Sequence, residues 1–387
     1  MTTSNYSPAK RQSNLELLRV VSMLLIIAHH YVVNSGILEH LSLSNHPANF
    51  LFLILWSMWG KTGINIFILI SSYFMCQSNL TLRRYCKVAF EWIFYHYAIY
   101  IIMLLAGYET ISIQRVCTLL FAPFINANAT GSFASSFLVF YLFIPFMNSF
   151  IANIGCKEHR RFIFLLLFTF TGLSTFFINR SIFGEVFWFC AVYFIGSYLR
   201  LYPPTWSTNL HQSVKLLILS WLLCYASVLS IAFILKCIGM DTPSFSMLTY
   251  FVFDANKLGA VLVSIFMFCT FKNLHISYSK AINLFAQTTF GILMIHDNGT
   301  LRPLLWKNLL HVDMSYSLTP PILAVRSVLI VFVVFLACSL IDMVRLFFIE
   351  SPIFQRFYWF EKILKQIWNF VKITLHGMYN AITHITR

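Results

Sequence analysis

The sequence predicts an all-α protein, a polytopic transmembrane helical bundle. Of its 387 residues, 59% are hydrophobic and only 10% are charged, and its mean hydropathy is +0.75. Soluble domains carry about 25% charged residues, so a water-exposed surface does not suit this composition. The apolar runs are continuous rather than alternating, which favours helices over a closed barrel as the spanning structure.

The apolar runs are interpreted as ten spans, because a span needs about 20 mostly apolar residues. A Trp-bearing stretch, 46–58, is expected to form an interfacial helix before the second span, and 110–126 a re-entrant or surface segment. The predicted spans are 17–36, 59–76, 88–107, 134–153, 163–178, 184–200, 216–238, 257–271, 283–299 and 321–347.

Basic residues give these spans an orientation. An even number of spans places both termini on one side, and the positive-inside bias makes that side the cytoplasm. The formal net charge of +14 then reflects topology, and since no nucleic-acid-binding motif accompanies it, no nucleic-acid partner is expected. All but eight of the 27 Lys and Arg residues fall on the predicted inner side; the eight are Lys61, Arg115, Arg180, Lys236, Lys257, Arg302, Lys307 and Arg326.

The chain divides into a membrane-embedded region, 1–350, and a tail, 351–387. The tail is aromatic and basic, and it is expected either to lie on the anionic inner leaflet as an amphipathic helix or to pack in the cytoplasm. Nine scattered cysteines include no Cys-x-x-Cys pair, so neither a metal site nor a disulfide framework is expected. Without a sizeable soluble domain, any chemistry must take place among the helices.

The first span, NLELLRVVSMLLIIAHHYV, carries the clearest pattern of ionisable residues. Charge inside the hydrocarbon costs several kcal/mol, so such residues are functional candidates. Arg19 and His30 are eleven positions apart, which places them within roughly 20° of one direction and about 16 Å apart along a helix, with Glu16 within about 60°. A neutral buried histidine can act as a general base. The alternative for His30 is a simple hydrogen bond to a neighbouring helix.

Two further groups lie at opposite ends of the predicted bundle. Arg83 and Arg84 follow the second span on the inner side, where guanidinium groups suit phosphate, although on this motif alone ordinary positive-inside charge is the favoured explanation. His296, Asp297 and Asn298 end the ninth span on the outer side. They are expected to line a sugar site or to cap the helix and turn the chain.

Four further ionisable residues lie within the predicted spans. Asp342 and Arg345 are three positions apart, the spacing of an ion pair on a helix surface. Glu91 in the third span, like His96, is a candidate for which the sequence suggests no partner.

Several blocks together resemble the acyltransferase-3 family of integral membrane acyltransferases. Arg19 and His30 match its Arg-x10-His signature, and Glu16 stands where many members have Asp. The segments WGKTGINIFILISSYFM, FYLFIPFMN, FIGSYLR, TTFGILMIHDN and IDMVRLFFIE are similar to later blocks of the family, so the resemblance extends over roughly 14–350.

Two positions depart from the family pattern. Ser72, between Ser71 and Tyr73, replaces the usual Gly of the second-span motif, and Ser132 with Phe133 stands where many relatives have a Trp-Phe pair. These departures bear on acceptor recognition more than on the core chemistry, and they leave open a membrane sensor or a relative that has lost activity.

The resemblance implies a standalone bacterial enzyme of the cell (inner) membrane. It implies transfer of an acyl group, commonly acetyl, from cytoplasmic acetyl-CoA to a hydroxyl of a lipid-linked or surface polysaccharide. Acetyl-CoA is then a co-substrate, and no bound cofactor is expected.

The same resemblance suggests roles for the candidate residues. His30, Arg19 and Glu16 are the expected catalytic group, with His30 either a general base or a covalent acyl carrier. Arg83, Arg84, Ser71 and Tyr73 are expected at the donor site. His296, Asp297 and Asn298 are expected on the acceptor side.

A transporter or flippase for a glycolipid or small solute is the main alternative function. Ten spans with buried polar residues suit it, but the chain has no convincing internal repeat and only 14 Gly and 11 Pro to break spans.

Overall fold

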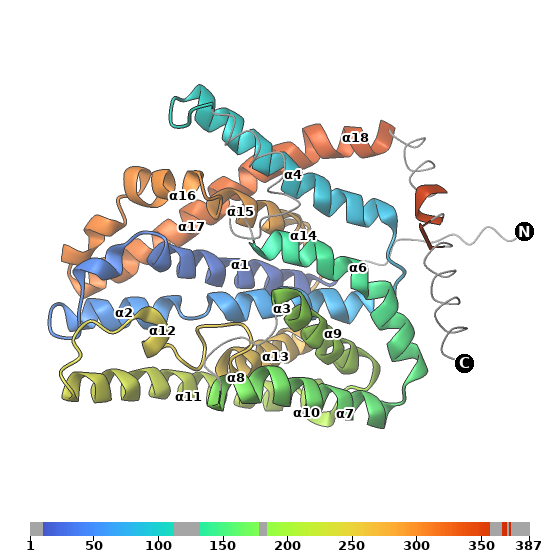
Figure 1. Cartoon of the computed structure of the whole chain (residues 1–387), viewed down its shortest axis with the longest axis horizontal. Helices are drawn as coiled ribbons and strands as arrows, with labels where there is room; N and C mark the ends of the chain where they lie inside the picture. Colours follow the sequence, from blue (N-terminus) through green and yellow to red (C-terminus); the bar gives the residue numbers. More distant parts are fainter. Residues whose placement is uncertain (1–10, 112–131, 178–183, 357–365, 370, 373–387) are drawn as a thin grey trace, which may run out of the picture.

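The computed structural model describes residues 11–111, 132–177, 184–356, 366–369 and 371–372, and within these ranges the regular structure is helical. Figure 1 shows the long helices running roughly alongside one another, as expected for a membrane bundle. Six helical stretches of this described part are long and apolar enough to cross a membrane: Ser13–Val33, Pro47–Met75, Leu82–Leu105, Phe133–Asn153, Leu210–Cys237 and Pro320–Gln355.

Each of the ten predicted spans falls on helical structure, whereas the number that cross the membrane stays a prediction. In chain order, the helices at those ranges are α1 (Ser13–Val33), α3 (Gly60–Met75), α4 (Leu82–Leu105), α6 (Ser132–Asn153), α7 with α8 (Cys156–Leu166 and Leu173–Phe176), α9 (Glu185–Leu201), α11 (Leu210–Cys237), α13 (Leu258–Asn273), α14 with α15 (Lys280–Gln287 and Thr289–His296) and α17 (Pro320–Val344).

Helix α1 occupies the centre of the bundle. It contacts α3, α13, α14, α15 and α17. It also contacts α2 (Pro47–Ser57), the helix that precedes α3 in the chain. Large side chains of α1 such as Leu18, Met23, Ile27 and Tyr31 are fully buried. The helix that carries the predicted Arg-x10-His pattern is therefore surrounded by protein, which allows polar side chains on it to meet partners rather than lipid.

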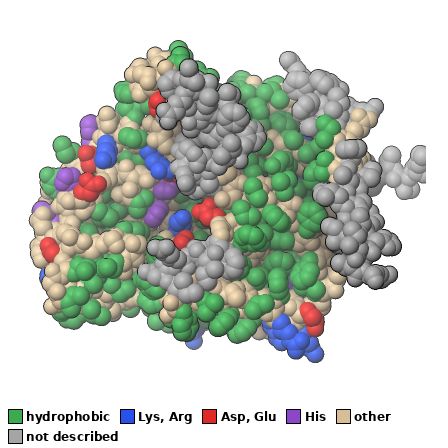
Figure 2. All heavy atoms as spheres, in the orientation of Figure 1, with side chains coloured by type: hydrophobic (Ala, Val, Ile, Leu, Met, Phe, Trp, Pro, Cys, Tyr) green, Lys and Arg blue, Asp and Glu red, His purple; other side chains and the backbone are tan. Residues whose placement is uncertain are grey.

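The outer helices present apolar side chains outward. Leu222 and Phe233 on α11 and Val325 and Leu329 on α17 are more than half exposed. Hydrophobic side chains cover broad areas of the face seen in Figure 2, and charged groups appear there in small patches. Exposed apolar area of this extent is what a lipid environment solvates, which agrees with a multi-pass membrane protein.

The interpretation of 46–58 as an interfacial helix is wrong. These residues form α2, which runs in line with α3 beside α1 in Figure 1 and packs against both α1 and α17. His46, with a φ of 55°, precedes the helix, and Pro47 begins it, where the missing proline N–H costs no hydrogen bond. Its tryptophan therefore belongs to the bundle rather than to the membrane surface.

Two other predicted segments lie mainly outside the described residues. The proposed surface piece 110–126 falls largely within 112–131, and most of the tail falls within 357–365 and 373–387. The described start of the tail is α18, Ser351–Arg356, which continues from α17 through a π-helical turn, Arg345–Glu350.

The close contact between α3 and α9 shows how a serine fits at position 72. Ser72 is fully buried, and its hydroxyl donates to the carbonyl of Leu69 at 2.9 Å. It faces Gly196 of α9, where an added Cβ would collide with the Ser72 side chain. The serine at position 72 is thus accommodated by a residue without a side chain on the opposing helix.

Replacing Gly196 by alanine is expected to lower the stability of the folded protein by about 1–3 kcal/mol, because the new methyl group overfills the α3–α9 contact. Unfolding in detergent measures this, with Gly184→Ala as the control, since a Cβ at Gly184 meets no atom within 4 Å. Adding Ser72→Gly to Gly196→Ala should restore most of the loss. Equal unfolding midpoints for Gly196→Ala and wild type would contradict the packing argument.

Candidate active site

The structure brings His30 of α1 to His296 at the end of α15. The two ring nitrogens, Nδ1 of His30 and Nε2 of His296, are 3.0 Å apart, and the ring centroids are 5.1 Å apart. These residues are 266 positions apart in the chain and lie on two neighbouring helices of the bundle. The predicted plain hydrogen bond to a neighbouring helix is thus present, and its partner is another predicted site residue.

The position of His296 is fixed by its surroundings. Its side chain is fully buried, and Nδ1 lies 2.6 Å from the carbonyl oxygen of Ile292, one turn earlier in α15. The buried indole of Trp306 lies edge-on to the His296 ring and to Tyr31 of α1. The His296 ring therefore has one orientation, held by backbone on one side and by α1 on the other.

These contacts determine where the protons lie when both rings are neutral. A carbonyl oxygen can only accept a hydrogen bond, so Nδ1 of His296 is the nitrogen that carries a proton. Nε2 of His296 is then an acceptor, and the proton in the bond between the two rings belongs to Nδ1 of His30. Nε2 of His30 is left with its lone pair, which is the form of imidazole that can take a proton.

Asp297 supports the same assignment from a second direction. Its Oδ1 lies 3.5 Å from Nδ1 of His30, and a carboxylate is an acceptor only. Arg302 holds that carboxylate, with Nε and Nη2 at 2.9 Å and 2.8 Å from Oδ1, and the amide of Asn34 lies 3.4 Å away. Asp297 and Arg302 are partly exposed, so this polar group continues from the buried His296 and the partly buried His30 towards the surface.

The other residues of the predicted outer group have different roles. Asn298 turns the chain, since its side-chain oxygen accepts from the backbone N–H of Thr300 at 3.0 Å. Of the two alternatives drawn from the sequence, capping is the one its contacts support. His29 is turned away from the pair, with Nδ1 2.9 Å from the carbonyl of Ser57 and its ring against Gly60.

Arg19 and Glu16 lie at the other end of α1. The Arg19 guanidinium is 3.3 Å from the Glu16 carboxylate, and Arg11 is 3.7 Å from the same group. Eleven residues of helix separate Arg19 from His30 by about 16 Å. Arg19 and His30 therefore belong to two separate polar regions joined by one helix.

The predicted donor residues are engaged mostly with the protein itself. The Ser71 hydroxyl donates to the Phe67 carbonyl of its own helix at 2.8 Å. Arg200, which the sequence identified only as an inner-side charge, donates to the Tyr73 hydroxyl at 2.9 Å and lies 4.7 Å above its ring.

Arg83 contacts α18. Its guanidinium donates to the carbonyl of Phe354 in α18 at 3.3 Å in an exposed position. Of the predicted donor residues, Arg83 is therefore bonded to α18, and Ser71 and Tyr73 are taken up by other side chains and backbone.

Comparison with known proteins gives one match. The family model of acyltransferase-3, described as an acyltransferase domain, matches residues 12–342, most of the chain and all of the helices that form the histidine pair. The chain belongs to the acyltransferase-3 family. No curated protein and no solved structure matches it significantly. The resemblance drawn from Arg19, His30 and the later blocks is thereby confirmed.

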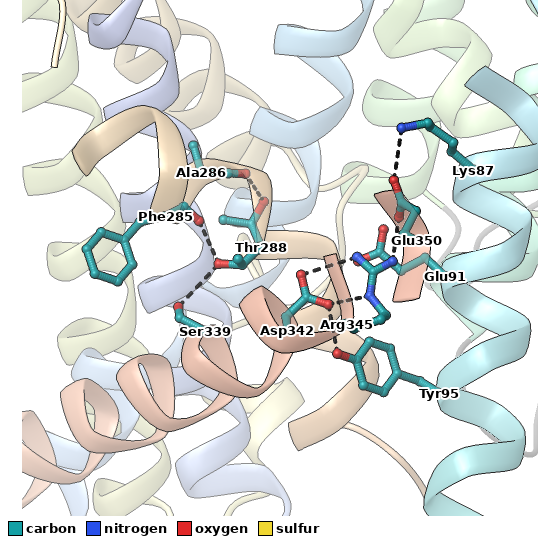
Figure 3. Close-up of polar contacts among 11 residues, drawn as sticks. Lys87, Glu91, Tyr95, Phe285, Ala286, Thr288, Ser339, Asp342, Arg345 and Glu350 are labelled. Atoms are coloured by element: carbon teal, nitrogen blue, oxygen red, sulfur yellow. Dashed lines mark hydrogen bonds and ion pairs between the residues drawn. The ribbon is translucent and has the colours of Figure 1, made fainter. Parts of the chain in front are cut away.

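A second polar region of this acyltransferase is a charge cluster formed by Glu91 and Tyr95 of α4 with Asp342, Arg345 and Glu350 (Figure 3). Arg345 is 2% exposed and its guanidinium reaches three carboxylates. The distances are 2.7 Å to Asp342, 2.9 Å to Glu91 and 2.5 Å to Glu350. The Tyr95 hydroxyl donates to Asp342 at 2.7 Å.

The charge cluster corrects two sequence interpretations. The Asp342–Arg345 pair exists, but it is buried and shared between helices rather than placed on a helix surface. Glu91 has a partner, Arg345, and His96 also interacts with other residues. Lys87 joins the cluster at its edge, 3.0 Å from Glu350. Among the described residues, no group of three or more His, Cys, Asp or Glu is arranged to hold a metal ion.

Replacing Arg345 by methionine is expected to destabilise the protein by about 3–5 kcal/mol, because three carboxylates then stay buried without their shared counter-charge. The measurement is the denaturation midpoint in detergent, compared with Arg161→Met at an exposed position of α7. A midpoint as high as that of the exposed control would show that the cluster does not need its guanidinium.

Proposed function

We propose that this acyltransferase moves an acetyl group from cytoplasmic acetyl-CoA to a hydroxyl of a cell-envelope or exopolysaccharide sugar, at the cell (inner) membrane. The observation that carries the proposal is the His30–His296 hydrogen bond, which leaves Nε2 of His30 free of a proton inside the bundle. The acyltransferase family supplies the reaction class, and the free imidazole nitrogen supplies the group that acyl transfer to an alcohol requires.

The proton balance of a general-base route fits this arrangement. Nε2 of His30 takes the proton of the sugar hydroxyl while the oxygen attacks the thioester carbonyl carbon. The carbon–sulfur bond then breaks, and the His30 imidazolium returns its proton to the departing CoA sulfur. During the interval in which His30 is positively charged, the carboxylate of Asp297, 3.5 Å from its Nδ1, stabilises that charge.

A covalent route uses the same nitrogen. Nε2 of His30 attacks the thioester carbonyl carbon and CoA leaves as a thiolate, which gives a positively charged acetyl-imidazolium. The sugar oxygen then attacks the acetyl carbon, the imidazole leaves as the neutral base, and the hydroxyl proton passes to the CoA thiolate. Both routes require a neutral His30 that presents Nε2 to the substrates, so the hydrogen bond from Nδ1 to His296 serves either of them.

The two ends of α1 suit two different substrates. The inner end, with Arg19, Arg83 and Arg84, offers guanidinium groups to the phosphates of CoA. The outer end has Asp297 and Arg302, which are partly exposed and of the type that hydrogen-bonds sugar hydroxyls. We therefore place the donor at the inner end and a lipid-linked or surface polysaccharide at the outer end, with His30 between them.

Glu16 has a supporting role in this proposal. Its carboxylate lies between Arg11 and Arg19 at 3.7 Å and 3.3 Å, so it holds the Arg19 guanidinium at the mouth of the bundle. Ser71 and Tyr73 contribute through the α3 backbone and through Arg200 rather than by direct contact with the donor.

The direct test is His30→Gln, with His29→Gln as a matched control in the adjacent position. We expect His30→Gln to lower acetyl transfer by at least about 100-fold, since a lost general base typically costs 10²- to 10⁴-fold. His29→Gln should keep transfer, because Nδ1 of His29 is bonded to the Ser57 carbonyl and its ring packs against Gly60 and Phe245, outside the His30–His296 hydrogen bond.

The assay compares labelled acetyl in envelope polysaccharide from cells that express each variant at equal membrane levels. Transfer by His30→Gln at the wild-type rate would exclude the proposed role of His30. Absence of polysaccharide acetylation in cells with the wild-type protein, compared with cells lacking it, would exclude the proposed acceptor.

A further inference from the structure

Helix α15 is held at both of its ends. It has only eight residues, and its last residue, His296, is hydrogen-bonded to His30. Five residues earlier, about 7.5 Å along the axis, Gly291 lies against the charge cluster. So short a helix behaves as a rigid rod, and a displacement at Gly291 moves His296 by a similar amount.

The contact at Gly291 is tight. A Cβ added to Gly291 would collide with the Asp342 carboxylate, so only glycine permits this approach of α15 to α17. Because Gly291 lies in the first turn of α15, its N–H is one of those that the helix itself cannot satisfy, and the partial positive charge there favours a carboxylate.

The charge cluster in turn has one arrangement. Arg345 bridges Asp342, Glu91 and Glu350, which come from two helices and the π-helical turn that follows α17. Tyr95 fixes Asp342 from α4 at 2.7 Å. Just before α15, the Thr288 hydroxyl lies 3.3 Å from that of Ser339 on α17 (Figure 3). The start of α15 is therefore held by α4 and α17 together.

We propose that the charge cluster is a positioning site for the catalytic histidine pair. Arg345, paired with Glu91 and Glu350, holds the Asp342 carboxylate against Gly291 of α15 and thereby keeps Nε2 of His296 at hydrogen-bond distance from Nδ1 of His30. The inference rests on the proposed role of His30, and it adds residues that touch neither substrate. Arg345 and Glu350 lie beyond residue 342, where the family match ends.

The test uses Gly291→Ala, which pushes α15 away from Asp342, and Gly172→Ala as the matched control. Gly172 is also a glycine in a helical segment, but a Cβ there makes only ordinary contacts of 3.7 Å and 3.8 Å. We expect Gly291→Ala to lower kcat by about 100-fold with an unchanged KM for acetyl-CoA, since a misplacement of about 1 Å near a reaction centre has that effect. Gly172→Ala should match wild type in both constants.

The rate per folded molecule distinguishes positioning from a general loss of folding. Rates are expressed per folded molecule, so a variant that only folds less well would show the wild-type kcat and would overturn the proposal.

A second readout needs no substrate. Nitrogen NMR of protein labelled with ¹⁵N-histidine reports which ring nitrogen of each imidazole carries the proton, and His30→Gln and His296→Gln variants assign the signals. In Gly291→Ala the His30 and His296 signals should lose the pattern of wild type, and in Gly172→Ala they should keep it. Unchanged signals in Gly291→Ala would overturn the proposal. This readout does not depend on acetyl transfer, so a wild-type protein that transfers no acetyl group would contradict the proposed function alone.

If Gly291→Ala does not accumulate, Asp342→Asn takes its place. It keeps the size of the side chain and weakens the bonds to Arg345, and it must show the same loss of kcat and the same change in the histidine signals.

Discussion

The hydrogen bond between His30 and His296 is the interaction on which the rest of this structure depends. A neutral imidazole can carry its proton on either nitrogen, and the protein contacts around these two rings decide which nitrogen it is. The Ile292 carbonyl decides it for His296, and His296 with Asp297 decides it for His30. One bond of 3.0 Å thus gives an otherwise ambiguous residue a defined chemical form.

Two charged groups frame this pair at different depths. Towards the outer end, Asp297 and Arg302 are partly exposed, and water shares the cost of their charges. In the charge cluster, Arg345 and Asp342 are almost fully buried, where unpaired charge costs several kcal/mol. The cluster offsets that cost by satisfying one guanidinium with three carboxylates. A network of this kind defines a single arrangement of helices, which is useful where a short helix must be placed accurately.

The sequence revealed the helices and one half of the site for clear physical reasons. Long apolar runs show where helices lie, because lipid requires the backbone to bond within each segment. The eleven-residue interval between Arg19 and His30 was readable since both lie on one helix. The contact between His30 and His296 could not be predicted, although His296 was itself a predicted site residue. The two histidines meet only through the packing of α1 on α15, and spacing along the chain carries no information on that contact.

The errors have physical causes as well. The interval between Asp342 and Arg345 indicates a helical pair but not its burial, and their meeting with Glu91 depends on how α4 packs beside α17. The segment 46–58 looked interfacial because it has a tryptophan and is short. In the structure it continues in line with α3, so its length as a separate helix was misleading. Glycines 196 and 291 gave no signal in the sequence, because their importance comes from the side chains opposite them.

The pH dependence of kcat for acetyl transfer is the most direct test of the central claim that neutral His30 accepts a proton or the acetyl group at Nε2. The reactive form is the unprotonated one, so kcat should fall tenfold per pH unit once the solution is acid enough to protonate His30, and level off above that titration. The residual rate of a variant without the His30 imidazole should lack that fall. A kcat that rises as the solution is acidified, or an acid fall that persists unchanged without the His30 imidazole, would contradict this account.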